Sequence, residues 1–469
     1  MPFSLRQLSL LSLSVGLIAC SEPATNTSDA DALNAEIALG SAVKRLCSSV
    51  LVSGRSTDHV MANELSGPGL EGVNFRIEDD LVTGEGMGHV VRALYREHLG
   101  CTLVKETSPE ALRQQFDAAG YPDAPAAPDA QWPLGNQVTL PDEVPGIDLA
   151  AVNRAVDASF EDIEPGQDID TRAVLVIHEG EIIAEQYAEP FDAQTPQLGW
   201  SMTKTVVGAL TGMLVGDGRL QVDAPAPVPE WQSTGDERGT ITLENLLQMS
   251  SGLQFSEEYT SGSMSDVILM LYTTGDTAGF TAQQPLEHPP GSTFYYSSGT
   301  TNLISRILRD TLGDQQSYFQ FPRERLFTPL GMSSAVIEPD ASGTFVGSSY
   351  MYATPRDWAK IGLLYLQDGV WDGERILPEG WVERSLTPPD SAANGQYGYQ
   401  VWLNAGAPDD PEDRSFPALP ANAWYLSGFE GQNIVALPDQ DLIIMRMGVT
   451  TSGPRPIWAL TEAVLGALE

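Results

Sequence analysis

The sequence predicts an α+β fold in which one antiparallel sheet of about five strands is flanked by terminal helices. Two strand-like runs, 173–177 and 181–187, surround Glu179-Gly180, a pair typical of a hairpin turn. Three more runs follow late in the chain, at 423–426, 433–437 and 442–447. Because the early and late runs must pair to form one sheet, the stretch between them is expected to be an inserted, mainly helical region facing the sheet across a cleft.

Three helices are expected around this sheet. Residues 148–160 have a helical pattern, and 456–468 place their apolar side chains on one stripe. A third helix is expected over 203–217, because Gly218 follows it and glycine commonly terminates helices. The long mixed stretch 219–400 carries further helix-like segments among glycines and prolines.

The 469 residues are too many for this domain alone. We expect a first unit at 39–120, a Pro/Ala-rich linker or wrapping arm at 121–144, and the large domain at 145–469. Cys47 and Cys101 both lie in the first unit. In an oxidising compartment an isolated pair predicts one disulfide, and two unrelated buried thiols are the alternative.

The first nineteen residues are expected to be a lipoprotein signal peptide. Arg6 precedes an apolar run, 8–18, that is too short to span a membrane as a mature helix. The run ends in Leu17-Ile-Ala-Cys20, which resembles the lipobox of bacterial lipoproteins. An ordinary signal peptide cut nearby, or a buried helix, is the alternative. The resemblance implies a membrane anchor through a lipid on Cys20, facing the periplasm at the outer membrane. The polar residues 20–38 would then be a flexible tether.

The chain is strongly acidic, with a formal net charge of −38. Without residues 1–19, 24 basic residues oppose 63 acidic ones, a charge of −39. This charge argues against nucleic acid and anionic membrane surfaces as partners. It can also reflect a salty habitat, so it indicates nothing about the substrate.

Ser201-Met-Thr-Lys204 places a hydroxyl and an amine three residues apart at the start of an expected helix. Positions i and i+3 share a helix face, so Lys204 can reach the Ser201 oxygen. A serine becomes a good nucleophile only when a neighbouring base takes its proton. A chance match is the alternative, because Ser41-Ala-Val-Lys44 fits the same spacing.

Two more segments, taken with this motif, resemble the class C β-lactamase and penicillin-binding-protein-like serine hydrolases over about 145–469. Pro290-Gly-Ser-Thr-Phe-Tyr-Tyr-Ser-Ser-Gly299 is similar to the family's Pro-Gly…Phe-x-Tyr-Ser-Asn and aligns Tyr296 with its catalytic tyrosine. Leu426-Ser-Gly-Phe429 stands where the family carries Lys/His-Thr/Ser-Gly. The resemblance implies a cofactor-independent and metal-independent hydrolase that forms an acyl-enzyme.

The resemblance also implies a role for each of these residues. Ser201 would be the nucleophile, and Lys204 its base if burial and a positive environment lower the lysine pKa. Tyr296 would relay the proton to the leaving group. Backbone N–H groups of Ser201 and Phe429 would stabilise the oxyanion. Gly428 and Ser427 belong to the same substrate-binding segment.

Two departures from the family pattern narrow the expected substrate to a simple ester or a linear amide. Leu426 replaces a Lys or His and cannot form a charge-assisted bond with a substrate carboxylate. Ser298 replaces an asparagine and has less reach to a substrate amide. The run 428–433 resembles 6-aminohexanoate-dimer hydrolases, which are amidases and esterases. Tyr259 stands where those enzymes have a substrate-contacting tyrosine, and an ordinary loop aromatic is the alternative.

Other functions are less well supported by the sequence. No Gly-x-Ser-x-Gly occurs, which argues against an α/β-hydrolase, and the five histidines show no spacing typical of a triad or a metal site. β-Lactamase or D-Ala-D-Ala carboxypeptidase activity is one alternative. A non-catalytic envelope lipoprotein that keeps the fold as a binding module is the other.

Overall fold

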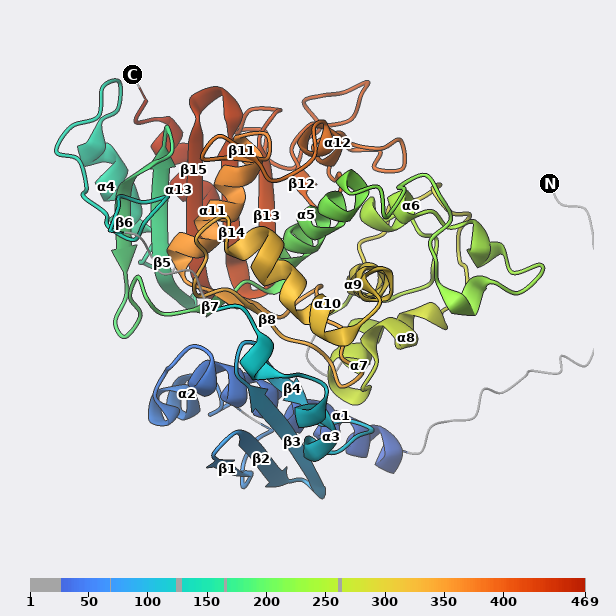
Figure 1. Cartoon of the computed structure of the whole chain (residues 1–469). Helices are drawn as coiled ribbons and strands as arrows, with labels where there is room; N and C mark the ends of the chain where they lie inside the picture. Colours follow the sequence, from blue (N-terminus) through green and yellow to red (C-terminus); the bar gives the residue numbers. More distant parts are fainter. Residues whose placement is uncertain (1–26, 68, 124–128, 164–166, 260–263, 469) are drawn as a thin grey trace, which may run out of the picture.

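The computed structural model describes residues 27–67, 69–123, 129–163, 167–259 and 264–468. The expected signal peptide and Cys20 therefore lie outside the described residues. Figure 1 shows a sheet covered by helices, a mainly helical region beside it, and an N-terminal unit packed below both. No helix in the described ranges has the length and apolar character needed to cross a bilayer.

The main sheet has six antiparallel strands in the order β12-β13-β14-β15-β5-β6. Residue Ile444 of β15 lies opposite Val176 of β5, and this pairing joins the late strands to the early hairpin. The α+β prediction is confirmed, and β12 adds a short sixth strand at the edge. The strands are β5 (Ile169–His178), β6 (Glu181–Tyr187), β12 (Trp402–Leu403), β13 (Trp424–Gly428), β14 (Gln432–Leu437) and β15 (Leu442–Thr450).

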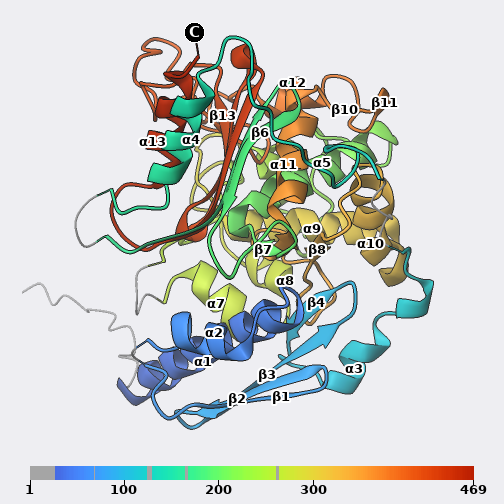
Figure 2. The same ribbon diagram turned by 90° about the vertical axis from the view of Figure 1, so that its left-hand side faces the viewer.

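Helices cover both faces of this sheet (Figure 2). Alternate residues of β5 point to opposite faces, so Val174 packs with α4 (Leu149–Ala158) and α13 (Pro456–Leu465), whereas Leu175 packs with α5 (Thr203–Gly216) and α11 (Pro355–Leu366). The three helices expected around 148–160, 203–217 and 456–468 are therefore present. Each is shorter than its predicted range at its C-terminal end.

The region between the two groups of strands is mainly helical, as expected. Helix α9 lies at its centre and contacts α5, α6, α8 and α10. The helices are α6 (Leu243–Leu247), α7 (Asp266–Thr273), α8 (Thr277–Ala282), α9 (Ser298–Leu312), α10 (Gln315–Pro322) and α12 (Trp381–Ser385). Small sheets are formed by β7 (Gln197–Leu198), β8 (Val336–Ile337) and β9 (Met351–Ala353), and by β10 (Val370–Trp371) with β11 (Glu374–Arg375).

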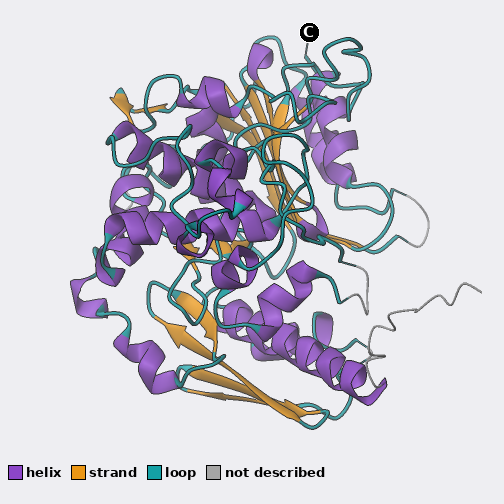
Figure 3. Cartoon of the chain, turned by 90° about the vertical axis from the view of Figure 1, so that its right-hand side faces the viewer, coloured by secondary structure: helices purple, strands orange, loops and turns teal. Residues whose placement is uncertain are grey.

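The N-terminal unit consists of a long helix lying on a four-stranded antiparallel sheet (Figure 3). A Cβ at Gly84 would lie 2.5 Å from the Val43 side chain, so only glycine permits this close approach of helix and sheet. A disulfide joins Cys47 of α1 to Cys101 of β4, the pairing that the sequence predicts. The elements are α1 (Thr27–Leu51), α2 (Thr57–Asn63), β1 (Asn74–Glu78), β2 (Leu81–Gly86), β3 (His89–Arg96), β4 (Gly100–Leu103) and α3 (Pro109–Gln114).

The prediction of a flexible tether over 20–38 is wrong for its described part, because α1 begins at Thr27. The polar composition of 27–38 suggested a solvated chain, but this part of α1 belongs to a helix that packs against α7 of the large domain. Gly40 marks this contact, since a Cβ there would lie in ordinary van der Waals contact with the Tyr272 carbonyl oxygen, at 3.4 Å. Such a tertiary contact leaves little trace in composition.

The segment 121–144 was left open between a linker and a wrapping arm, and its described part is an arm. Trp132 is buried in the core of the large domain. Its indole Nε1 donates a hydrogen bond to the Arg356 carbonyl oxygen at 3.3 Å. A buried tryptophan of this kind fixes the arm to the domain surface.

Candidate active site

Ser201 lies in a single 3-10 turn, Trp200–Met202, that leads directly into α5. Trp200 has a φ of +49°, in the left-handed region that a bulky side chain rarely adopts. Its indole Nε1 donates to Glu430 Oε2 at 3.2 Å. A Cβ at Gly199 would lie 2.1 Å from the Trp358 ring. The turn is therefore held on both sides, and it presents Ser201 at the positive end of a helix.

The Lys204 ammonium group contacts three oxygens at once. Its Nζ donates to Ser201 Oγ at 3.0 Å, to Ser298 Oγ at 3.0 Å and to the Ser348 carbonyl oxygen at 2.9 Å. The side chain is buried, and loss of solvation lowers the Lys204 pKa to about 8, although Glu257 acts to raise it. The expectation of a positive environment is therefore wrong, because the charge beside Lys204 is the negative charge of Glu257. Burial alone lowers the pKa of this lysine.

Tyr296 joins this pair although nearly a hundred positions separate it from Ser201. Lys204 Nζ lies 4.8 Å from the centroid of the Tyr296 ring. Burial and Glu257 raise the pKa of the phenol, and a hydrogen bond with Ser201 partly offsets the rise. The ring stacks on Trp402 with centroids 5.1 Å apart. The hydroxyl, the amine and the phenol thus meet in one site.

Glu257 is a site residue that the sequence analysis missed. Its carboxylate accepts hydrogen bonds from the Ser298 backbone N–H at 2.8 Å, from Ser298 Oγ at 2.5 Å and from the Tyr259 hydroxyl at 2.7 Å. Ser298 begins α9, so the carboxylate occupies the N-terminal end of a fifteen-residue helix, where negative charge is favoured. Nothing in the sequence distinguishes Glu257 from 62 other acidic residues.

Ser298 has a different role from the one expected of it. The sequence analysis treated it as a short replacement for a substrate-contacting asparagine. In the structure its hydroxyl lies between Lys204 Nζ and the Glu257 carboxylate, with bonds to both. Ser298 therefore couples the charge of the acid to that of the lysine.

The segment expected to form the oxyanion site lies beside the nucleophile turn. A Cβ at Gly428 would lie 2.2 Å from the Gly199 carbonyl oxygen, so glycine is required where β13 approaches the turn. Phe429 follows directly. The Ser427 hydroxyl, in contrast, accepts a hydrogen bond from Arg455 Nη1 at 3.1 Å, which directs that side chain toward the start of α13. Leu426 is 1% exposed and packs in the core.

Tyr259 faces the same region from the other side. Its ring stacks on Phe429 with centroids 4.8 Å apart and an interplanar angle of 29°, and Phe429 meets Trp200 edge to face at 5.5 Å. These three aromatic side chains line a pocket of about 570 Å³. Tyr259 is thus placed beside the expected oxyanion residue and is bonded to Glu257.

The second Ser-x-x-Lys sequence has a separate role in the N-terminal unit. Lys44 forms a buried ion pair with Glu338 and donates to Ser48 Oγ at 3.0 Å. Its Nζ also lies 4.3 Å from the centroid of the Tyr350 ring. These contacts attach α1 to the large domain.

Across the described ranges, no group of three or more His, Cys, Asp or Glu side chains is arranged to hold a metal ion.

Comparison with known proteins agrees with this geometry. A family model described as beta-lactamase matches residues 156–459. The 6-aminohexanoate-dimer hydrolase of Paenarthrobacter ureafaciens is 24% identical over 306 residues, covering 61% of this chain and 74% of the relative.

Solved structures with the same fold include a penicillin-binding protein homologue from Caulobacter crescentus (TM-score 0.53, 19% identity, covering 71% of this chain and 99% of that one). A family VIII carboxylesterase also matches, with a TM-score of 0.51 and 16% identity, covering 69% of this chain and 98% of that one.

Proposed function

The chain belongs to the beta-lactamase family of serine hydrolases, and on that premise we propose that it cleaves short acyl esters or linear amides through an acyl-enzyme on Ser201. The observation that carries the proposal is the contact of Lys204 Nζ with Ser201 Oγ at 3.0 Å, made by a lysine whose pKa burial lowers to about 8. A general base works best when its pKa lies near the working pH, so Lys204 with this pKa is suited to take the serine proton.

In the acylation step, neutral Lys204 takes the proton of Ser201 as Oγ attacks the substrate carbonyl carbon. The oxyanion that forms is stabilised by the backbone N–H groups of Ser201 and Phe429, each contributing about 2.7–4 kcal/mol in comparable sites. Tyr296 donates its proton to the departing alkoxide or amine and recovers one from Lys204. The raised pKa of this phenol keeps it protonated until the leaving group develops negative charge.

In the deacylation step, a water molecule attacks the acyl carbonyl carbon and the bond to Ser201 Oγ breaks. The same lysine and tyrosine remove the proton from water and return one to the serine, as microscopic reversibility requires. The products are the free acid and the regenerated hydroxyl.

The preference for esters and linear amides over β-lactams is supported by Leu426. This position carries Lys or His in the family pattern, and the leucine here is buried in the core. No cation is therefore offered at that position to a β-lactam carboxylate. The amidase named among the relatives, a 6-aminohexanoate-dimer hydrolase, is consistent with this preference.

Labelling with a fluorophosphonate probe tests the nucleophile, and a substrate panel tests the specificity. We expect the wild type to be labelled and to hydrolyse p-nitrophenyl acetate and butyrate, and Ser201→Ala to do neither. Ser66→Ala is the matched control, since it removes an exposed serine hydroxyl that is not among the residues of the site or of the adjoining pocket. Nitrocefin should be turned over weakly or not at all. Nitrocefin turnover at about 10 s⁻¹ or faster, typical of dedicated enzymes, would refute the argument from Leu426.

We also propose that the mature protein is anchored by a lipid on Cys20 and faces the periplasm. The lipobox-like Leu17-Ile-Ala-Cys20 supports this proposal. Metabolic labelling with a palmitate analogue in a bacterial host should mark the wild type and not Cys20→Ser. Equal labelling of the two would contradict it.

A further inference from the structure

The pocket beside the nucleophile turn is walled on one side by the N-terminal unit. Its volume of about 570 Å³ lies within the range of small-molecule sites, about 300–1,000 Å³. Helix α1 forms one wall of the pocket, and the large domain (the hydrolase domain, 145–469) forms the other. The apolar lining includes Ala35, Ile37 and Ala38 from α1, and Trp200, Tyr259 and Phe429 from the hydrolase domain.

This pocket lies beside the turn that carries Ser201, because Trp200 of that turn is one of its lining residues. Trp200 immediately precedes Ser201, and Phe429 is the expected oxyanion residue. Tyr259 is joined to Lys204 through the hydrogen bonds of Glu257 and Ser298. An acyl chain in the pocket would therefore lie beside the turn that carries Ser201 and beside Phe429.

The pocket and the proton donor belong to separate groups of side chains. Tyr296 packs in a separate aromatic cluster with Tyr397 and Trp402, and this cluster shares no residue with the pocket lining. Because Tyr296 protonates the leaving group, that group belongs on the side of the aromatic cluster. The acyl group is left with the pocket.

The charge of the lining disfavours an anionic chain, because its described residues include the acid Asp31 and one cation that is already paired. Arg45 is the one cation among the described lining residues. It is already paired with Glu430, its Nη2 lying 2.8 Å from Oε1, and its Nη1 lies 3.8 Å from Glu64 Oε2. A carboxylate at the end of the acyl chain would therefore find no free cation in this lining.

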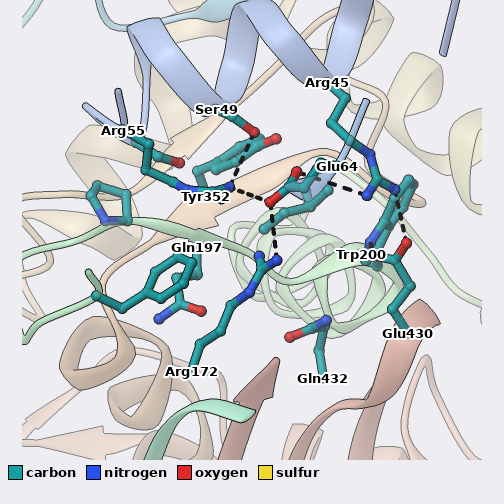
Figure 4. A pocket seen from close by; sticks show the side chains of 14 residues that line it. Arg45, Ser49, Arg55, Glu64, Arg172, Gln197, Trp200, Tyr352, Glu430 and Gln432 are labelled. Atoms are coloured by element: carbon teal, nitrogen blue, oxygen red, sulfur yellow. Dashed lines mark hydrogen bonds and ion pairs between the residues drawn. The ribbon is translucent and has the colours of Figure 1, made fainter. Parts of the chain in front are cut away.

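A buried ionic cluster holds α1 in place against the nucleophile turn (Figure 4). Glu64 is the centre of the cluster, with Arg55 at 2.5 Å, Arg172 at 3.0 Å and Arg45 at 3.8 Å. Glu430 extends the cluster, since its carboxylate accepts hydrogen bonds from Arg45 and from the Trp200 indole. Removing one member of a buried pair is costly because its partner is left unpaired, so the cluster makes α1 a fixed wall.

We propose that α1 of the N-terminal unit forms the acyl-chain site of this enzyme and selects an apolar acyl group longer than butyrate. The proposal rests on the proposed hydrolysis at Ser201 and specifies its substrate. Each methylene placed in such a site should raise kcat/KM about fourfold, the factor that corresponds to about 0.8 kcal/mol per buried methylene. The hexanoate has four more methylenes than the acetate, so we expect the wild type to prefer p-nitrophenyl hexanoate and octanoate over the acetate by about two hundredfold or more.

Narrowing the pocket from either wall tests the proposal. Ala38→Phe acts from α1, and Ile268→Trp acts from α7, so misfolding of one variant leaves the other as a test. Ala32→Phe is the matched control, because Ala32 is an exposed residue of the same helix outside the lining. We expect the two pocket variants to lose about tenfold more in kcat/KM for the octanoate than for the acetate. The control variant should keep the wild-type kcat/KM for both esters.

Three results would overturn the proposal. The first is a wild type without preference for longer acyl chains. The second is a loss of acetate and octanoate hydrolysis in equal proportion in properly folded pocket variants. The third is a chain-length response in alkyl acetates, which would place the alcohol in the pocket instead. Failure of the proposed function is distinguishable, since the wild type would then neither be labelled at Ser201 nor hydrolyse any ester.

Discussion

We expect the charge of Glu257 to set the pH at which Lys204 can act as the base for Ser201. Ser298 Oγ lies 3.0 Å from Lys204 Nζ and 2.5 Å from Glu257 Oε1, so the two charges are at most about 5.5 Å apart. At an effective dielectric constant of about 20, this separation gives about 3 kcal/mol of attraction. That energy corresponds to about two pH units of stabilisation of the protonated lysine.

Glu257→Gln should therefore lower the Lys204 pKa. The carboxylate favours the charged form of the lysine and raises its pKa, whereas burial lowers it to the net value of about 8. Without the carboxylate, only the lowering of the Lys204 pKa by burial remains. Because Glu257 is half-buried and water screens part of its field, we expect a shift of about one to two pH units toward acid. The variant should be relatively more active below neutrality than the wild type, although its plateau falls because a less basic amine is a weaker base.

The assay is the pH dependence of kcat/KM for p-nitrophenyl acetate from about pH 5.5 to 9.5, which reports the pKa values of the free enzyme. Absorbance is read at the isosbestic wavelength of p-nitrophenol, so that ionisation of the product does not distort the rate. The wild-type profile should rise with a midpoint near 8. Glu258→Gln is the matched control, because it removes the same charge from the adjacent, exposed position.

An unchanged midpoint in Glu257→Gln, or a shift toward higher pH, would refute the reasoning. So would an equal shift in Glu258→Gln, because a general change of surface charge would then explain the effect. A lower midpoint in Glu257→Gln alone would assign the effect to the bridge through Ser298.

The remaining predictions concern the proton donor, the packing beside the nucleophile and the disulfide. Tyr296→Phe should lower kcat by about 10²–10⁴, since the leaving group then departs without a positioned acid; a change within twofold would contradict this role. Gly428→Ala should lower kcat/KM by about tenfold to a hundredfold, because its Cβ would lie 2.2 Å from the Gly199 carbonyl oxygen and must displace the turn. Gly67→Ala, with open space at the Cβ position, should have no such effect. Replacing both disulfide cysteines with serine should cost about 4 kcal/mol of unfolding free energy for a sequence separation of 54, measured by denaturant titration; a loss below about 1 kcal/mol would show that the constraint is unimportant.

The N-terminal unit has two connections to the chemistry. The ionic cluster of Arg45, Arg55, Glu64, Arg172 and Glu430 fixes its position, and the apolar side of α1 closes the pocket. The family model begins only at residue 156, after this unit. The catalytic machinery is thus a property of the family, whereas the proposed acyl-chain site depends on a unit outside the family match.

The strands and the terminal helices could be predicted because their signals are local. The continuous apolar run of β5, buried at every position from Ala173 to Ile177, and the apolar stripe of α13 are read directly from neighbouring residues. The disulfide needed only the presence of two remaining cysteines. Helix α1 could not be predicted over 27–38, because the polar residues there resemble those of a flexible tether. The helix also contacts α7, which lies more than two hundred residues away in the sequence.

The sequence by itself determined the proposed reacting set, since Ser201-x-x-Lys204 and the segment around Tyr296 are short motifs whose spacing carries their chemistry. Only the tertiary structure decided the environment of that set. It placed Glu257 and Ser298 next to Lys204, buried Leu426 in the core and brought α1 to the edge of the site. The physical reason is that pKa values and pocket shape depend on burial and on charges brought together across the fold, and these have no local signature along the chain.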